Sequence, residues 1–382
     1  MKSERLAGLD VFRGLIMVIM ALDHASYFAA KIHRYEFWGL ALPTYPDAVS
    51  FITRFLTHLC APGFFFMMGA GMVLLANSRR SRGWPEGKVT RFFLIRGLIL
   101  VLLQFFLENP AWLIGMLNDK TQTLSSAAMP GSGGEIRCFF GVLYALGMSM
   151  VVWALLRRLR SSLIIGLSLA FILLTQILIP SAENVERLYS PVLRMLLIPG
   201  QTGTMRALYP LIPWLGIVGL GIVFGRGLIG NRKNTQRWTL FAGAASIIVF
   251  LIVRTLGSFG NFHPAQGTKP AAFLNLTKYP PSLAFILLTM GLNWLLLYLL
   301  MKRETAPAKW TGPLLIFGQT ALFFYLVHLY LYALIGFGFP QGTGYGLLYI
   351  VWLVGLAALY PLCFLYRRFK SKKSLDSIWR FF

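Results

Sequence analysis

Hydrophobic residues fill most of the chain in long segments that are separated by shorter polar stretches. A transmembrane helix needs about 20 consecutive, mainly apolar residues. Ten segments meet or approach this length, the shortest with the help of flanking residues: Val11–Ala30, Phe51–Ala76, Phe92–Leu107, Cys138–Leu156, Ser161–Pro180, Tyr209–Phe224, Trp238–Val253, Pro281–Met301, Pro313–Phe337 and Tyr345–Tyr366. The pattern predicts an all-α, polytopic transmembrane helix bundle of about ten spans, with residues 1–382 as a single integral-membrane domain.

The composition excludes other classes of protein. The 382 residues are 57% hydrophobic and only 13% charged, whereas a soluble domain is about a quarter charged. Disordered chains are polar and poor in aromatic residues, but this one is 15% aromatic. Three cysteines are too few for a disulfide scaffold of this length.

The formal net charge of +23 carries topological information. Most Lys and Arg residues fall at the N-terminus, in alternate connections and in the tail 367–382. Basic stretches stay cytoplasmic, so we expect both termini on the cytoplasmic side. The surplus charge then faces anionic lipid, and no nucleic acid partner is expected. Asp10, Arg13 and the pair Asp23-His24 make the first apolar run a poor cleavable signal.

Three histidines lie inside predicted spans, where ionisable residues are rare and usually functional. His24, His58 and His328 belong to three distant spans, and the helical rise places all three at a similar depth in the outer half of the membrane. His33 and His263 fall in outer loops. We predict that the three membrane histidines share a pocket, although single interhelical hydrogen bonds are the plain alternative. The spacings typical of zinc sites are absent, so no metal is expected.

Other polar residues accompany these histidines. Asp23 precedes His24, and a carboxylate can orient an imidazole. Adjacent helical residues diverge by about 100°, so an orienting contact can also come from another helix. Arg54 and His58 are four residues apart and share a helix face.

Two further patterns have weaker meaning. Tyr325, His328 and Tyr332 follow helical spacing and form one stripe. Asp10 and Arg13 lie three residues apart near the inner end of the first span, where they can pair.

Small residues and basic residues mark two more segments. The runs Gly69-Ala70-Gly71 and Gly216–Gly225 favour close helix approach, and no phosphate-binding loop is present. The cytoplasmic segment Arg79–Arg96 can either signal topology, as every cytoplasmic connection does, or bind phosphates.

Several of these segments resemble a known family. The chain is similar to the heparan-alpha-glucosaminide N-acetyltransferase-like multipass acyltransferases, many of them bacterial, over nearly its whole length. The resemblance is carried by LDVFRG at 9–14, MALDH at 20–24, RFLTHLCAP at 54–62, FMMG at 66–69, YPLIPWLG at 209–216, LTKYPPSL at 276–283 and FYLVH at 324–328.

This resemblance implies acyl transfer across a bacterial inner membrane. The donor would be cytoplasmic acyl-CoA, specifically acetyl-CoA, used as a co-substrate without a permanently bound cofactor. The acceptor would be a sugar, a glycan or a lipid-linked sugar on the outer side. His24, oriented by Asp23, would act as general base or transient acyl carrier, with His58 and His328 in the same pocket. The eukaryotic lysosomal members have their proposed catalytic histidine further along the chain, nearer His33.

Donors to a developing oxyanion are needed as well. The candidate substrate-binding residues are polar groups within the segments just described: Arg54, Tyr325, Lys278, Tyr279, Asp10 and Arg13. From the basic segment, Arg91 and Arg96 are candidates for the phosphates of coenzyme A.

Two other classes of function use the same features. A transporter or flippase would employ the histidines as a proton relay, and it predicts inverted repeats and spans broken near the midplane. An accessory membrane subunit would need none of the histidines. A homo-oligomer is compatible with each of these functions.

Overall fold

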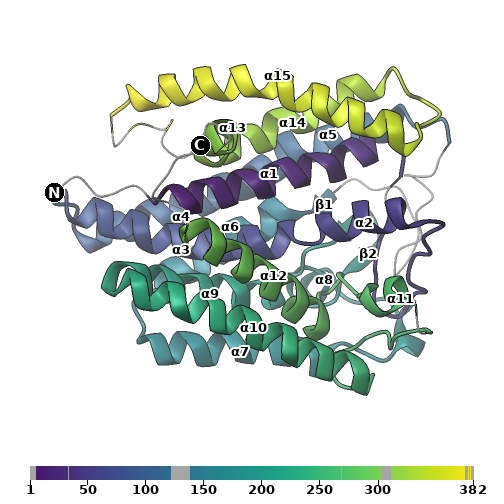
Figure 1. The fold of residues 1–382 in the computed structure, drawn as a ribbon, viewed down its shortest axis with the longest axis horizontal. Helices are drawn as coiled ribbons and strands as arrows, with labels where there is room; N and C mark the ends of the chain where they lie inside the picture. The colour runs from purple at the N-terminus through teal and green to yellow at the C-terminus, as the bar shows by residue number, and fades with distance from the viewer. Residues whose placement is uncertain are drawn as a thin grey trace.

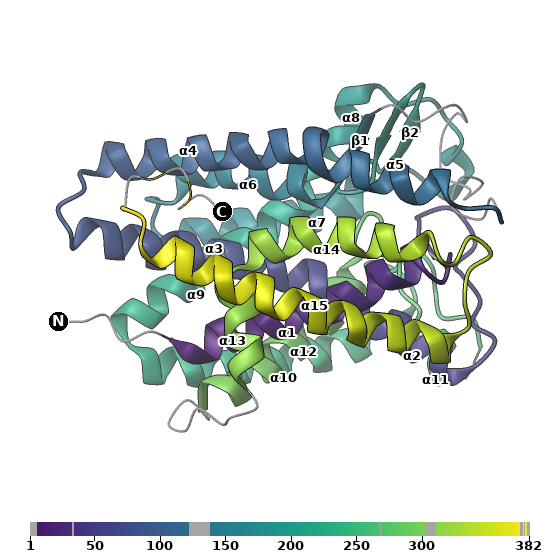
Figure 2. The ribbon, with the colours of Figure 1, turned by 90° about the horizontal axis from the view of Figure 1, so that it is seen from above.

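The computed structural model describes residues 6–32, 34–121, 138–267, 269–302, 311–374, 377 and 379. Helices dominate this part of the chain and run side by side along the long axis of one bundle (Figure 1 and Figure 2). The long helices are α1 (Ala7–Phe28), α3 (Cys60–Arg80), α4 (Glu86–Leu103), α6 (Val142–Leu156), α7 (Ser161–Leu178), α9 (Leu211–Gly230), α10 (Arg232–Leu256), α12 (Leu283–Lys302), α14 (Ala321–Gly336) and α15 (Tyr345–Ser371). The predicted all-α polytopic bundle is confirmed.

Two spans are built from consecutive helices. Helix α2 (Ala48–Thr57) leads into α3, and α4 continues through a π-helical turn (Gln104–Glu108) into α5 (Asn109–Leu117). With each pair counted once, eight helices in the described residues are long and apolar enough to cross a membrane. Helix α13 (Gly312–Gln319) and α14 meet at a bend of 96° and together form a ninth. Each of the ten predicted segments contains helix, although Cys138–Leu156 begins with a short strand and its helix, α6, has only 15 residues.

The two ends of the bundle differ in their charge and their connections. Helix α1 begins and α15 ends at the same end, on the left in Figure 1. This is the end at which the basic connections lie, and we call it the basic end. The opposite end carries the longer loops and the short elements, and we call it the loop end. The start of α1 and the end of α15 therefore lie on one side of the bundle, as the charge pattern predicts.

Glycines allow close approach at two helix crossings. A Cβ on Gly69 of α3 would overlap the carbonyl oxygen of Val218 on α9, and one on Gly221 would overlap that of Phe66. A Cβ on Gly318 of α13 would overlap the carbonyl oxygen of Asp10 on α1. The predicted close approach at the glycine runs is therefore confirmed, because these backbones touch where a side chain is missing.

The loop end contains a small sheet that the sequence did not predict. Strands β1 (Cys138–Phe140), β2 (Gly200–Thr202) and β3 (Met205–Ala207) lie in the order β1-β3-β2. Strand β1 is parallel to β3, and β2 is antiparallel to it. The short helix α8 (Pro191–Leu196) packs against β2 and β3, whereas α11 (Pro270–Leu274) lies at the same end of the bundle beside α2 (Figure 2).

Two buried arginines order these loops by donating to backbone carbonyls. Arg194 is 0% exposed and donates to the carbonyls of Pro199 and Arg187 and to the hydroxyl of Thr202. Arg254, at the end of α10, donates to four carbonyls and one amide oxygen of the loop that precedes α12. That loop carries Lys278 and Tyr279, and the peptide bond between Tyr279 and Pro280 is cis.

Candidate active site at the loop end

Two histidines from opposite ends of the chain form the centre of the site. Nδ1 of His24 on α1 lies 2.6 Å from Nε2 of His328 on α14. Nδ1 of His328 lies 3.0 Å from the carbonyl oxygen of Phe324. A carbonyl can only accept, so this Nδ1 carries the proton, and Nε2 of a neutral His328 accepts from Nδ1–H of His24. The lone pair of a neutral His24 is therefore on Nε2, as a general base requires.

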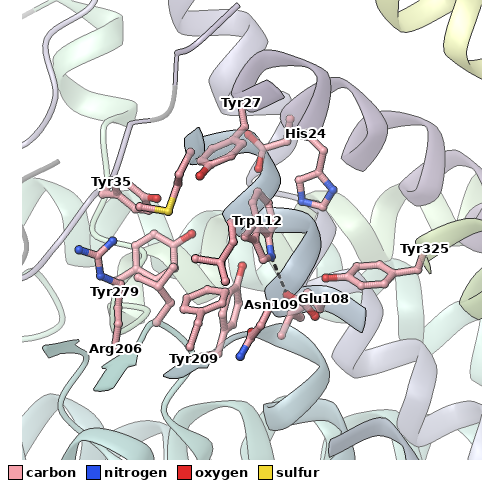
Figure 3. Close-up of a pocket in the computed structure, with 16 residues that line it drawn as sticks. His24, Tyr27, Tyr35, Glu108, Asn109, Trp112, Arg206, Tyr209, Tyr279 and Tyr325 are labelled. Atoms are coloured by element: carbon pink, nitrogen blue, oxygen red, sulfur yellow. Dashed lines mark hydrogen bonds between the residues drawn. The ribbon is translucent and has the colours of Figure 1, made fainter. Parts of the chain in front are cut away.

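Aromatic residues surround this pair and line the adjoining cavity (Figure 3). The ring of Trp112 meets that of His24 edge to face at a centroid distance of 5.1 Å, and Tyr325 does so at 6.2 Å. The aromatic lining consists of Tyr27, Tyr35, Trp112, Phe139, Tyr209, Tyr279 and Tyr325. A concave, mainly apolar site with a few convergent polar groups is the usual form of a small-molecule site.

The π-helical turn brings a carboxyl group to the cavity. Glu108 is 1% exposed, and its Oε1 accepts from the indole N–H of Trp112 at 3.1 Å. Gln104, at the other end of the turn, donates to Asn109 at 2.9 Å and accepts from the backbone N–H of Tyr144. Sequence analysis did not place Glu108 in the site, and the available signal was a carboxyl group directly after the predicted span Phe92–Leu107.

A charge network lies behind the histidine pair and includes Glu36, which sequence analysis also missed. Arg54 donates to both carboxylate oxygens of Glu36, at 2.8 and 2.7 Å, and its third nitrogen donates to Asp23 at 2.8 Å. Burial alone would raise the pKa of the Glu36 carboxyl, but the charges of Arg54 and His58 outweigh burial and hold this pKa well below its usual range. Glu36 is therefore ionised at neutral pH.

His58 belongs to this network and not to the histidine pair. Its Nε2 lies 3.4 Å from a carboxylate oxygen of Glu36. His58 thus contacts Glu36, and its predicted place in one pocket with His24 and His328 stays a prediction. His58 lies at the break between α2 and α3, and its side chain turns toward the loop that holds Glu36.

The neighbours of the predicted base also differ from expectation. The contact that fixes His24 is made by His328, whereas Asp23 accepts from Arg54. The side chains of Asp23 and His24 point about 100° apart around α1, so each meets a different helix.

Lys278 and Tyr279 reach the site through their backbone. Both amide nitrogens donate to the carbonyl oxygen of Glu36 at 3.0 Å, and Trp38 donates back to the carbonyl of Tyr279. The ring of Tyr279 lines the cavity, and the ammonium of Lys278 lies 5.2 Å from the centre of that ring. His33 lies outside the described residues, and the described residues contain no cluster of three His, Cys, Asp or Glu side chains that could hold a metal ion.

A sequence model of the family described as heparan-alpha-glucosaminide N-acetyltransferase, catalytic, matches residues 5–256. The chain belongs to this family. No individual curated protein matches it. Membership supports a multi-pass membrane protein with an acetyltransferase-type function. The match includes His24, Glu36, Arg54 and Glu108, whereas His328 lies beyond its end.

The acetyltransferase-family fold contains a second cavity that opens toward the basic end. Its polar lining comprises Arg13, Arg96, Gln319 and Lys370. Its apolar lining includes Met17, Met67, Met68, Met72 and Met150. This cavity and the first share two lining residues, Val142 and Tyr325.

Of the two residues predicted to bind coenzyme A, Arg91 and Arg96, only one lines this cavity. Arg96 lines the second cavity, whereas Arg91 is exposed and is absent from its lining. Residues five apart on a helix differ in direction by about 140°, which explains the separation. Arg13 pairs with Asp10 at 3.3 Å and also donates to the carbonyl of Gly318, so part of its role is to join α1 to α13.

Proposed function

We propose that this protein transfers an acyl group, specifically acetyl, from acyl-CoA at the cytoplasmic face to a sugar acceptor on the outer face of the bacterial cytoplasmic membrane. One observation carries the proposal. A cavity from the basic end and a cavity from the loop end meet at Tyr325 and Val142, next to the histidine pair. A thioester entering from one side and an acceptor entering from the other would meet at His24.

The basic-end cavity suits coenzyme A in both charge and polarity. Arg13, Arg96 and Lys370 supply positive charge for its phosphates near the entrance. Flexible methionine side chains, which adapt well to an elongated ligand, line the deeper part that the pantetheine arm would follow.

The transfer step follows from the tautomer of the histidine pair. Nε2 of His24 takes the proton from the acceptor hydroxyl or amine as the new carbon–oxygen or carbon–nitrogen bond forms, and Nδ1–H keeps donating to His328. The carbon–sulfur bond then breaks, and the proton passes from His24 to the departing thiolate. The Tyr325 hydroxyl is the candidate donor to the oxyanion, because the three nitrogens of Arg54 are engaged with Glu36 and Asp23, whereas the Tyr325 hydroxyl interacts with the carboxyl of Glu108 beside the same cavity.

The test uses purified protein in lipid nanodiscs with radiolabelled acetyl-CoA and a panel of sugar and lipid-linked sugar acceptors. We expect transfer by the wild type and a loss of about 100-fold or more with His24→Ala, which removes the base. Arg96→Gln should raise KM for acetyl-CoA, whereas Arg91→Gln, which removes the same charge outside the cavity, should not. If wild type and His24→Ala are equally inert with every acceptor, the proposal is wrong.

The 96° bend between α13 and α14 supports a second candidate, because transporters are built around broken spans. A transporter or flippase would use His24 and His328 as a proton relay. Proton-coupled uptake of a sugar into proteoliposomes without turnover of acetyl-CoA would favour this alternative over acyl transfer.

A further inference from the structure

Arg206 differs from the other buried arginines at the loop end. Arg54 makes three hydrogen bonds to carboxylates, Arg194 makes three bonds to loop oxygens, and Arg254 makes five. Arg206, on β3, is 7% exposed and makes a single hydrogen bond within the described part of the chain, from Nη2 to the amide oxygen of Gln201 at 3.2 Å. Its Nε is buried without a partner. A buried guanidinium with unused donors is costly, and each such case calls for an explanation.

The surroundings of Arg206 supply no counter-charge within the described residues. It forms no ion pair with any described Asp or Glu side chain. Tyr35 is close, but burial raises the pKa of this phenol above its ordinary value, so Tyr35 is neutral at physiological pH. Burial lowers the pKa of the Arg206 guanidinium, but from so high a starting value that it stays charged.

The cavity that Arg206 lines contains a second polar side chain whose hydrogen-bonding capacity is not fully used. Oε2 of Glu108 is buried and makes no well-formed hydrogen bond, although the Tyr325 hydroxyl interacts with this carboxyl, while Oε1 accepts from Trp112. Figure 3 shows Arg206 beside Tyr279 and Tyr35 at one end of the cavity, and Glu108 beside Tyr325 at the other end. His24 lies on the side of Glu108. The cavity is therefore polarised, with an acceptor group near the base and a cationic donor far from it.

We infer that the acceptor sugar carries an anionic group, a carboxylate or a phosphate, which Arg206 binds while Glu108 holds the hydroxyl or amine that attacks the thioester. This inference rests on the proposed function and adds the chemical class of the acceptor to it. An anion would complete the donor set of Arg206, since a guanidinium binds carboxylate and phosphate through two parallel hydrogen bonds. A hydrogen on the nucleophile would satisfy Oε2 of Glu108 and hold the nucleophile close to Nε2 of His24. The aromatic side chains between the two ends would contact the ring.

The experiment compares three matched acceptors: the neutral methyl glucosaminide, glucosamine 6-phosphate and a glucosamine-derived uronate. Hydrogen bonds to charged groups are worth enough to give about a 10- to 100-fold preference in kcat/KM for the anionic acceptors. Arg206→Gln should abolish this preference, so that kcat/KM becomes the same for the anionic sugars and the neutral sugar. The two anionic sugars show whether the site takes carboxylate or phosphate. Arg187→Gln is the matched control, because it removes an exposed arginine from the same loop layer.

Binding of the sugars without acetyl-CoA, measured by calorimetry, tests the inference independently of turnover. We expect tighter binding of an anionic sugar to wild type than to Arg206→Gln, with Arg206→Lys intermediate because Lys keeps the charge but loses the two-pronged geometry. Arg206→Lys also guards against a folding defect in the Gln variant. Equal binding of neutral and anionic sugars to wild type, or a preference that survives in Arg206→Gln, would overturn the inference. Transfer to the neutral sugar in that case would leave the proposed function intact.

Discussion

Removing the charge of Glu36 should destabilise the protein far more than a typical loop substitution. The carboxylate is 0% exposed and accepts two hydrogen bonds from Arg54, which is itself only 7% exposed. Glu36→Gln keeps the shape of the side chain and one acceptor oxygen. Of the two carboxylates that Arg54 contacts in the described structure, only that of Asp23 then remains. Breaking a buried ion pair costs about 3–5 kcal/mol. Because Asp23 still neutralises part of the charge, we expect the free energy of unfolding to fall by about 3 kcal/mol.

The dependence on pH gives this prediction a direction as well as a size. The pKa of Glu36 is lowered in the folded protein, so its contribution to stability is fully present above the unfolded pKa of about 4.3 and disappears as pH falls through the folded value. The free energy of unfolding of wild type and Glu36→Gln in detergent can be measured by denaturant titration between pH 7 and pH 3. The difference between the two proteins should be constant above about pH 5 and should shrink in acid. The double variant Glu36→Gln/Arg54→Met should lose less than the sum of the two single variants. A difference of less than about 0.5 kcal/mol at pH 7 would refute the reasoning, since that is the effect of an ordinary surface change.

Two further predictions concern the histidine pair and the helix crossings. His328→Phe removes the acceptor for Nδ1–H of His24 and should lower kcat about 100-fold or more with an unchanged KM for acetyl-CoA. His328→Gln, which restores an acceptor, should recover part of the rate. An unchanged kcat in His328→Phe would show that His328 does not position the base. Gly318→Ala forces α13 away from the Asp10 carbonyl of α1 and should destabilise by about 1–3 kcal/mol. Gly166→Ala, on α7 where no atom lies within 4 Å of the new methyl group, is the control, and equal thermal unfolding temperatures for the two variants would contradict the packing argument.

The helical spans could be predicted because the bilayer imposes a length and a polarity on each of them. Even the short apolar runs were helical, and α4 proved longer than predicted because the π-helical turn carries it on into α5. The sheet at the loop end could not be predicted in the same way. Its strands have three residues each, so hydrophobic alternation has no length over which to appear, and β1 lies far in the sequence from β2 and β3.

The site shows the same division between what a helix determines and what the tertiary structure adds. Depth along a helix placed His24 and His328 at one level, and they are in contact. Depth says nothing about the direction of a side chain around the helix axis or at a break, so it could not indicate that His58 contacts Glu36. Glu36 lies in a loop and Arg206 in the short strand β3, and the loops around them depend on Arg194, Arg254 and the backbone bonds to Tyr279. No local pattern in the sequence marks such residues.

The charge network and the histidine pair are linked because one helix carries both. Asp23 and His24 are neighbours on α1 and point in directions about 100° apart. When Asp23 is held by Arg54, and Arg54 in turn by Glu36, the rotation of α1 about its own axis is fixed, and His24 is thereby directed at His328. The Glu36 network therefore acts on the proposed base through α1 without touching the reacting atoms. It follows that Glu36→Gln should lower kcat even under conditions where the variant is fully folded, and that His328→Phe should not lower the stability that Glu36 provides.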